Sequence, residues 1–345
     1  MRWLWGSRSP GARLARVLLL PLAGLYGLVV AGRAVLYRWG WRRPVRLPLP
    51  TVAVGNLAVG GTGKTPFSAW LAAWLLQSGA HPGILLRGYG GDEPLVHARL
   101  VPGARVEADP DRGRGADRAR QGGADALVLD DAFQTLAVGR DVNLALVAVE
   151  HLDSSPWLLP AGPWREGWGA LGRADGIVVT RKRAALPAAS ALAGELARRN
   201  PGVPVGIVQL ALTGFTELRS GRALPAAVLE GRRVLAAAGV ADPESFATQL
   251  RERAGAVQLV AYQDHHAYSD ADVAVLLNAA ATTDYVVVTE KDAVKLRSRW
   301  PAEAREPLVA GLGVRWEQGR EAIEALLSAR LRRPRSSTDP STTTL

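Results

Sequence analysis

Residues 58–66 read AVGGTGKTP, a glycine-rich turn that ends in Gly63, Lys64 and Thr65. A phosphate-binding loop has a glycine, four further residues and then G-K-[ST], and here Ala58 stands where the first glycine is expected. The apolar run TVAVGN precedes the turn and predicts a strand, and an apolar stripe with helical spacing follows it over residues 67–75. This order of strand, turn and helix is typical of a phosphate-binding loop. The alternative is a glycine-rich turn that binds no nucleotide.

Backbone N–H groups in such a loop bind phosphate oxygens at the start of the helix. Lys64 is then expected to reach the β- and γ-phosphates, and the Thr65 hydroxyl to ligate Mg²⁺. A magnesium site also needs a carboxylate at the end of a neighbouring buried strand. The run ALVLDD places Asp130 and Asp131 there, although two acids can otherwise cap the turn after a strand. The candidate ATP-binding residues are Gly60, Gly61, Thr62, Gly63, Lys64 and Thr65.

Short apolar runs alternate with helical patterns beyond residue 51, which predicts a parallel α/β sheet. Strand candidates in the first half are GILL, ALVLDD, NLALVAVE and GIVVT, at residues 83–86, 126–131, 143–150 and 176–180. Further strands are expected at 204–212, 232–239 and 285–292, with a helix over about 243–253 and a connection between two lobes over 213–231. The predicted fold class is α/β: a P-loop NTPase-type, mostly parallel sheet flanked by helices, with a smaller C-terminal α/β lobe.

The predicted division of the chain has four parts. They are an N-terminal membrane-associated helix within residues 1–45, a P-loop core over 46–212, a C-terminal α/β lobe over 213–331 and a disordered tail over 332–345. The tail is polar and rich in Pro, Ser and Thr, a composition that is typical of disorder.

The basic charge is concentrated at the N-terminus. The chain has a formal net charge of +10, and eleven basic residues precede Asp92, which is its first acidic residue. Within this segment, residues 17–31 are uniformly apolar, with arginines and tryptophans on both sides. Arginines and interfacial tryptophans around an apolar helix are typical of a segment that lies at an anionic membrane surface. We therefore expect a membrane surface to be one partner of this protein.

Three other interpretations of residues 17–31 are open. A membrane span needs about 20 apolar residues, and this run of 15 reaches that length only if the flanking arginines extend toward the membrane surface. A cleaved signal peptide would export the phosphate loop away from cellular ATP. A buried core helix would not need so many flanking arginines.

Composition and motifs exclude several other classes of protein. The chain has no cysteine, which excludes disulfides, cysteine-ligated zinc, iron–sulfur clusters and thiol catalysis. Switch GTPases carry an N-K-x-D element, which is absent, and in TEKD at residues 289–292 the lysine comes one position too late. The guanine-specific interpretation is correspondingly weakened.

Several motifs, taken together, resemble the tetraacyldisaccharide 4′-kinases, membrane-associated enzymes that use ATP to phosphorylate the lipid A disaccharide precursor. That family also lacks the first loop glycine and keeps G-G-T-G-K-T. The matching stretches are LYGLVVAGRAVLYRWGW (25–41), VGNLAVGGTGKTP (54–66), RGYG (87–90), GDEP (91–94), LDDAFQ (129–134), PAGPWRE (160–166), DHHAYS (264–269) and VTEKDAVKL (288–296). They occur in the family's order, and the ordered set is far more specific than any single motif.

The resemblance implies roles for individual residues. Asp92 matches the family's catalytic carboxylate and His265 the histidine that pairs with it, while Lys64 serves catalysis as well as phosphate binding. Asp130, Asp131 and Thr65 occupy metal-site positions, together with the active-site acid Glu93. Further active-site positions are Arg87, Tyr89, Gln134, Arg165, Glu166 and Asp264. Because a sugar hydroxyl is a poor nucleophile at neutral pH, a carboxylate base paired with a histidine suits this reaction.

The sequence also departs from the family's usual pattern. RGYG runs directly into GDEP, whereas many relatives place a longer segment between them. Ala132 and Thr135 replace the glycine and histidine of D-D-G-F-Q-H, and Gly167 replaces a proline. Thr135 cannot titrate near neutral pH as a histidine does.

The predicted activity is transfer of the ATP γ-phosphoryl group to the 4′-hydroxyl of a tetraacyldisaccharide 1-phosphate, with Mg²⁺. The resemblance implies an acylated glucosamine disaccharide lipid as partner, no nucleic acid or protein partner, and a location at the cytoplasmic face of the bacterial inner membrane. Two alternatives are a membrane-associated P-loop ATPase that drives assembly or transport, and a nucleotide-binding scaffold without turnover.

Overall fold

The computed structural model describes residues 2–7, 9–88, 91–152 and 154–331. Tyr89 and the tail over 332–345, both named in the sequence predictions, lie outside these residues. The strands are β1 (Thr51–Asn56), β2 (Pro82–Leu86), β3 (Arg105–Ala108), β4 (Ala126–Leu129), β5 (Val142–Ala148), β6 (Gly176–Arg181), β7 (Val205–Glu217), β8 (Ala223–Leu224), β9 (Arg233–Ala238), β10 (Ala256–Ala261), β11 (Tyr285–Thr289) and β12 (Leu308–Gln318).

One continuous sheet contains all the strands of the described chain. Its order is β10-β9-β11-β12-β7-β6-β5-β1-β4-β2-β3, and β8 pairs with β7. The pairings are parallel except for those that β7 makes with β12 and with β8. The predicted mostly parallel α/β sheet is confirmed. β1 lies between β4 and β5, so the loop that follows it opens at the carboxyl edge of the central strands.

Helices cover both faces of this sheet. They are α1 (Arg2–Gly6), α2 (Pro10–Arg38), α3 (Lys64–Gln77), α4 (Glu93–Leu100), α5 (Arg112–Gln121), α6 (Leu186–Arg199), α7 (Pro243–Arg251), α8 (Asp270–Ala280), α9 (Glu290–Leu296) and α10 (Arg320–Leu331), with 3₁₀ turns at Val149–His151, Trp168–Arg173 and Ala226–Leu229. In the first lobe, α3 and α10 pack on one face, where Phe67, Leu71 and Leu327 are buried. On the other face, Leu192 and Leu196 of α6 pack against β5 and β6.

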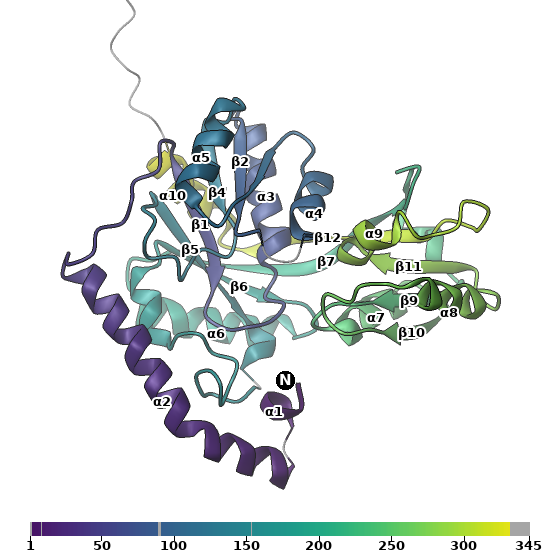
Figure 1. The fold of residues 1–345 in the computed structure, drawn as a ribbon, viewed down its shortest axis with the longest axis horizontal. Helices are drawn as coiled ribbons and strands as arrows, with labels where there is room; N and C mark the ends of the chain where they lie inside the picture. The colour runs from purple at the N-terminus through teal and green to yellow at the C-terminus, as the bar shows by residue number, and fades with distance from the viewer. Residues whose placement is uncertain (1, 8, 89–90, 153, 332–345) are drawn as a thin grey trace, which may run out of the picture.

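The C-terminal lobe continues the same sheet and is joined to the first lobe by β7 and β12 (Figure 1). The expected connection over 213–231 is wrong in its first part, because β7 extends to Glu217 by pairing with β12. The expected strand over 285–292 ends at Thr289, whose side chain accepts a hydrogen bond from the Asp292 backbone N–H and starts α9. α10 returns to the first lobe and packs in its core through Ile323 and Leu327.

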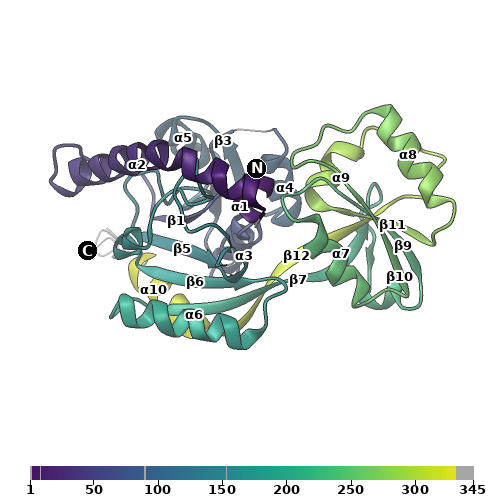
Figure 2. The same ribbon diagram turned by 90° about the horizontal axis from the view of Figure 1, so that it is seen from below.

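The N-terminal helix α2 is 29 residues long and lies along one side of the first lobe (Figure 2). Its length and a mean hydropathy of 2.0 over 18 residues are sufficient to cross a membrane, and only 6% of that window is buried. Buried core packing is therefore not the role of this helix. Its exposed large apolar side chains are Leu14, Val17, Leu18, Leu22, Leu25, Leu28, Val29 and Val35.

Candidate active site

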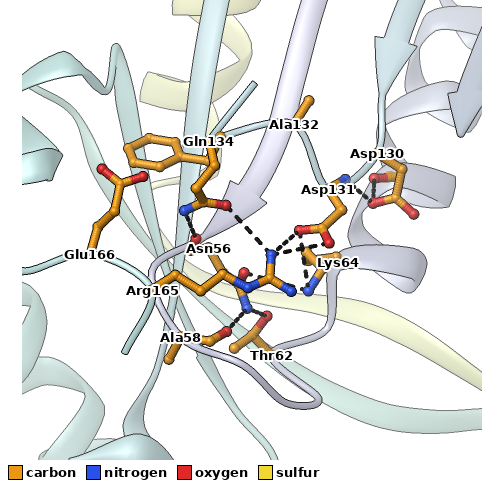
Figure 3. Close-up of polar contacts among 12 residues, drawn as sticks. Asn56, Ala58, Thr62, Lys64, Asp130, Asp131, Ala132, Gln134, Arg165 and Glu166 are labelled. Carbon is orange, nitrogen blue, oxygen red and sulfur yellow. Dashed lines mark hydrogen bonds and ion pairs between the residues drawn. The ribbon is translucent and has the colours of Figure 1, made fainter. Parts of the chain in front are cut away.

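The phosphate loop is shaped by Asn56, the last residue of β1. Its buried side chain donates hydrogen bonds to the Ala58 carbonyl at 2.7 Å and to Thr62 Oγ1 at 2.6 Å (Figure 3). The hydroxyl of Thr180 donates to the Thr62 carbonyl at 3.0 Å, which ties the loop to the end of β6. Ala58 pairs with Trp164 in an isolated bridge and is buried, so the position of the missing glycine is held by neighbouring chain.

Gly63 precedes α3 with a φ of 87°, in the left-handed region that favours glycine. A methyl group at this position would lie 2.3 Å from Leu210 Cδ1, so close packing also requires glycine here. The turn delivers the chain into α3 at Lys64, and the first backbone N–H groups of the helix remain available for an anion. The loop geometry expected from the sequence is therefore present.

Lys64, Asp131 and Arg165 form the charged centre of the site. Lys64 Nζ lies 3.5 Å from Asp131 Oδ1, and Arg165 Nη1 donates to the two Asp131 oxygens at 2.9 and 3.1 Å (Figure 3). Gln134 links this centre to β1, because its Nε2 donates to the Asn56 carbonyl at 2.7 Å. Asp131 adopts a φ of 49°, which turns its carboxylate into the site.

Asp130 is positioned differently from Asp131. It is buried, and it accepts hydrogen bonds from Ser68 Oγ at 3.0 Å, from the Asp131 backbone N–H at 2.9 Å and from His97 Nε2 at 2.9 Å. Burial raises the pKa of Asp130, but His97, Lys64 and Ser68 outweigh it and keep this pKa below its usual value. Asp130 is thus an ionised residue that joins β4 to α3 and α4.

The donors of the site fit Mg²⁺ bound together with a nucleotide. Among the described residues, no group of three or more His, Cys, Asp and Glu side chains is arranged to hold a metal ion by itself. Mg²⁺ usually takes one or two protein ligands and completes its shell with phosphate oxygens and water. Thr65, Asp131 and the phosphates would supply this set. Asp130 already accepts three hydrogen bonds, and its assignment to the metal site, like that of Glu93, stays a prediction.

Asp92 lies at the contact between the two lobes. It precedes α4 in the first lobe, and its Oδ2 is 3.1 Å from Lys295 Nζ and 3.3 Å from His265 Nδ1, both in the C-terminal lobe. Neither Asp92 oxygen has a hydrogen bond of good geometry among the described residues, so the Lys295 contact is an ion pair with spare acceptor capacity. Burial raises the pKa of Asp92, but the opposite effect of Lys295 and His265 is larger. The pKa of Asp92 is therefore below its usual value, and the carboxylate is ionised at neutral pH.

A cleft of about 890 Å³ connects these groups. The phosphate end contributes Lys64, Thr65, Asp131 and Arg165, the lobe contact contributes Glu93 and His265, and α2 contributes Tyr26, Val30 and Arg33. The cleft is also lined by Arg87, Asp130, Gln134, Thr135 and Glu166. Asp92 is not part of this lining, because it is only 4% exposed and lies behind His265.

Some predicted residues have mainly supporting contacts. Glu166 accepts a hydrogen bond from Arg173 at 2.6 Å, and this guanidinium stacks 4.4 Å from the Phe133 ring centroid. Asp264 lies 4.0 Å from His265 Nε2. His265 has a φ of 60°; with Asp131, it makes up the non-glycine residues with positive φ in the described chain. Such backbone is common for Asp and His and concentrates at functional sites.

The sequence predictions missed Asn56, Ser68, His97 and Lys295 as site residues. Asn56 and Lys295 stand inside motifs that were recognised, so their position in those motifs was an available signal. His97 and Ser68 face inward from helices, where a single polar residue gives no signal until its partner is known.

Comparison with known proteins identifies relatives over nearly the whole chain. The sequence model of the family described as Tetraacyldisaccharide-1-P 4'-kinase, LpxK, matches residues 15–91 and 90–332. The tetraacyldisaccharide 4'-kinase of Pelobacter propionicus is 38% identical over 317 residues, 84% of this chain and 85% of that protein. That of Aromatoleum aromaticum is 38% identical over 336 residues, 90% of this chain and 94% of that protein. The structure of LpxK from Aquifex aeolicus in complex with ATP is similar with a TM-score of 0.74, at 28% identity over 92% of this chain and 100% of that chain.

Proposed function

The chain belongs to the tetraacyldisaccharide-1-P 4'-kinase family, and we propose that it transfers the γ-phosphoryl group of ATP to the 4′-hydroxyl of a tetraacyldisaccharide 1-phosphate. One observation carries this proposal: the phosphate loop, the Asp92–His265 pair and the apolar helix α2 meet at a single cleft. A nucleotide, an acceptor hydroxyl and acyl chains are the three things that such a cleft must bring together.

The phosphate end of the cleft binds and orients the nucleotide. Lys64 and the N-terminus of α3 would hold the β- and γ-phosphates, while Arg165 offsets charge that develops on the transferring group. Thr65 and Asp131 would hold Mg²⁺, which would neutralise part of the phosphate charge. Asp130 fixes this arrangement through Ser68 and His97.

The lobe contact receives the acceptor hydroxyl. We assign proton acceptance to the Asp92–His265 pair as a unit, because His265 lines the cleft and Asp92 stands 3.3 Å behind it. Asp92 orients the imidazole and stabilises its positive charge, and Lys295 keeps Asp92 ionised. A shift of the C-terminal lobe away from α4 would expose Asp92 itself to the hydroxyl.

The helix α2 brings the cleft to the membrane. Its exposed leucines and valines suit the acyl region of a lipid layer, and its arginines suit anionic headgroups. Because ATP is available inside the cell, we propose the cytoplasmic face of the bacterial inner membrane as the location of the enzyme. The division into a membrane segment (1–45), a kinase core (46–212), a C-terminal lobe (213–331) and a tail (332–345) is part of the same proposal.

The test is transfer of label from γ-labelled ATP to the purified disaccharide lipid by the full-length protein in mixed micelles. We expect a labelled lipid that carries a new phosphomonoester at the 4′ position, with little free phosphate. Free labelled phosphate without labelled lipid would instead identify an ATPase. Bound nucleotide with neither product would identify a scaffold, and each of these results would refute the proposal.

A further inference from the structure

Lys182 is a basic residue with no assigned role in the proposed function. It follows β6 directly, and its Nζ lies 3.1 Å from the position that a methyl group would take at Gly61 in the phosphate loop. The backbone of the same turn is fixed by Glu150, whose Oε1 accepts N–H groups from Lys182 at 2.6 Å and from Arg183 at 2.9 Å. The backbone at Lys182 is therefore fixed, and its ammonium group lies beside the loop.

No carboxylate oxygen of the described residues lies within 4.0 Å of the Lys182 ammonium, judged from the ion pairs that the structure contains. The two nearest acids are committed elsewhere. Glu150 accepts three backbone N–H groups, and Asp242 starts α7 by accepting the Ser245 N–H and lies 3.8 Å from Arg183. Burial lowers the pKa of Lys182, which reflects the cost of a desolvated charge without a close partner.

A second basic residue, His151, also lies beside the loop, but it adds no positive charge. His151 Nε2 lies 3.1 Å from the methyl position at Gly60, and burial together with Lys182 lowers the pKa of His151 to about 4. His151 is neutral at physiological pH. Lys182 thus adds a positive charge beside Gly61, in addition to that of Lys64, which lies next to Asp131.

The distribution of lysine points in the same direction. Only four of the 42 basic side chains are lysines, at positions 64, 182, 291 and 295. Lys64 belongs to the phosphate loop, Lys295 pairs with Asp92, and Lys291 acts electrostatically on Glu93. The chain uses arginine at its other basic positions, and the three remaining lysines surround the site. A compact ammonium suits a narrow space beside a phosphate better than a planar guanidinium does.

We propose that Lys182 is a second phosphate-binding lysine, which contacts the phosphate chain of ATP across Gly61 from the side opposite to Lys64. This inference rests on the proposed function, and it adds a residue that the sequence motifs did not indicate. The phosphate that it binds is that of the nucleotide, because the Lys182 ammonium lies beside Gly61 of the phosphate loop. The negative charge of the bound phosphates would neutralise the Lys182 ammonium, which has no close carboxylate partner among the described residues.

The experiment measures nucleotide binding to the full-length protein in detergent, without lipid, by calorimetry with MgATP, MgADP and adenosine. We expect Lys182→Met to weaken ATP and ADP binding by roughly tenfold to a hundredfold and to leave adenosine binding unchanged. Lys182→Arg should restore part of the affinity. The matched control is Arg183→Met, which removes the neighbouring exposed charge and should leave the ATP affinity at the wild-type value.

Thermal unfolding of the nucleotide-free protein separates binding from a structural role. Because the mutation removes a partly buried charge without a close carboxylate partner, Lys182→Met should unfold at the same temperature as the wild type or higher. Unchanged ATP affinity in Lys182→Met, or equal losses of ATP and adenosine binding with a lower unfolding temperature, would overturn the inference. Failure of the wild type to bind any nucleotide would refute the proposed function instead.

Discussion

The phosphate end of the cleft and the lobe contact are built in different ways. At the phosphate end, Asn56, Thr180 and Gln134 hold the loop with hydrogen bonds of 2.6–3.0 Å within one lobe. At the lobe contact, Asp92 of the first lobe meets His265 and Lys295 of the other through charge contacts of 3.1 and 3.3 Å. Nucleotide binding is therefore preorganised locally, whereas proton acceptance depends on how two lobes meet.

The first substitution disrupts the phosphate end. Lys64→Met removes the ammonium group that faces the phosphates and leaves Asp131 to Arg165 alone. We expect turnover to fall about a hundredfold to a thousandfold and ATP to bind more weakly. Label transfer and calorimetry on the same preparation check this expectation. Wild-type turnover in this variant would contradict the assignment of the phosphate loop.

A triple substitution tests the role of α2 separately from the phosphate end and the lobe contact. Leu18, Leu22 and Leu25 are exposed on α2, so changing all three to glutamate should not disturb the fold. We expect binding to vesicles that contain anionic phospholipid to fall at least about tenfold, with ATP affinity unchanged. The matched control is Val275→Glu, an exposed apolar residue of α8. Equal sedimentation of the triple variant and wild type would remove α2 from membrane attachment.

His97 links the lobe contact to the phosphate end. It lies on α4, which begins next to Asp92, and its side chain is hydrogen-bonded to Asp130. His97→Leu leaves one Asp130 oxygen without its partner, which should lower the free energy of unfolding by about 1–3 kcal/mol and reduce turnover. Leu95→Ala on the exposed side of the same helix is the control. If His97→Leu matched wild type in chemical denaturation and in turnover, the proposed link between the lobe contact and the phosphate end would be refuted.

The smallest expected effect concerns pH. Glu290 starts α9 at the lobe contact, and burial raises its pKa to about 7, partly offset by Arg99. Because the unfolded state ionises at lower pH, stability should fall as pH rises from about 4.5 to 7, and Glu290→Gln should remove this slope. We expect the variant to unfold about 1–3 °C above wild type at pH 8 and at the same temperature at pH 4.5. Glu244→Gln, at an exposed site, should show no such difference.

The same contrast explains what the sequence could predict. The strand, turn and helix around Lys64 are local features, and the pair Asp130–Asp131 follows an apolar strand, so both were predictable. The orientation of that pair was not, because His97 and Ser68 reach Asp130 from positions 33 and 62 residues away. The extension of β7 to Glu217 was missed for the same reason, since its partner β12 begins at Leu308.

Asp92→Asn tests the role of the Asp92–His265 pair, with turnover and ATP affinity measured on one preparation. We expect turnover to fall about a hundredfold to ten-thousandfold, because the pair at the lobe contact can no longer stabilise the transferred proton. We expect the ATP dissociation constant to stay within about twofold of wild type, because the phosphate end is built separately. Wild-type turnover, or a loss of ATP binding as large as the loss of turnover, would contradict this role.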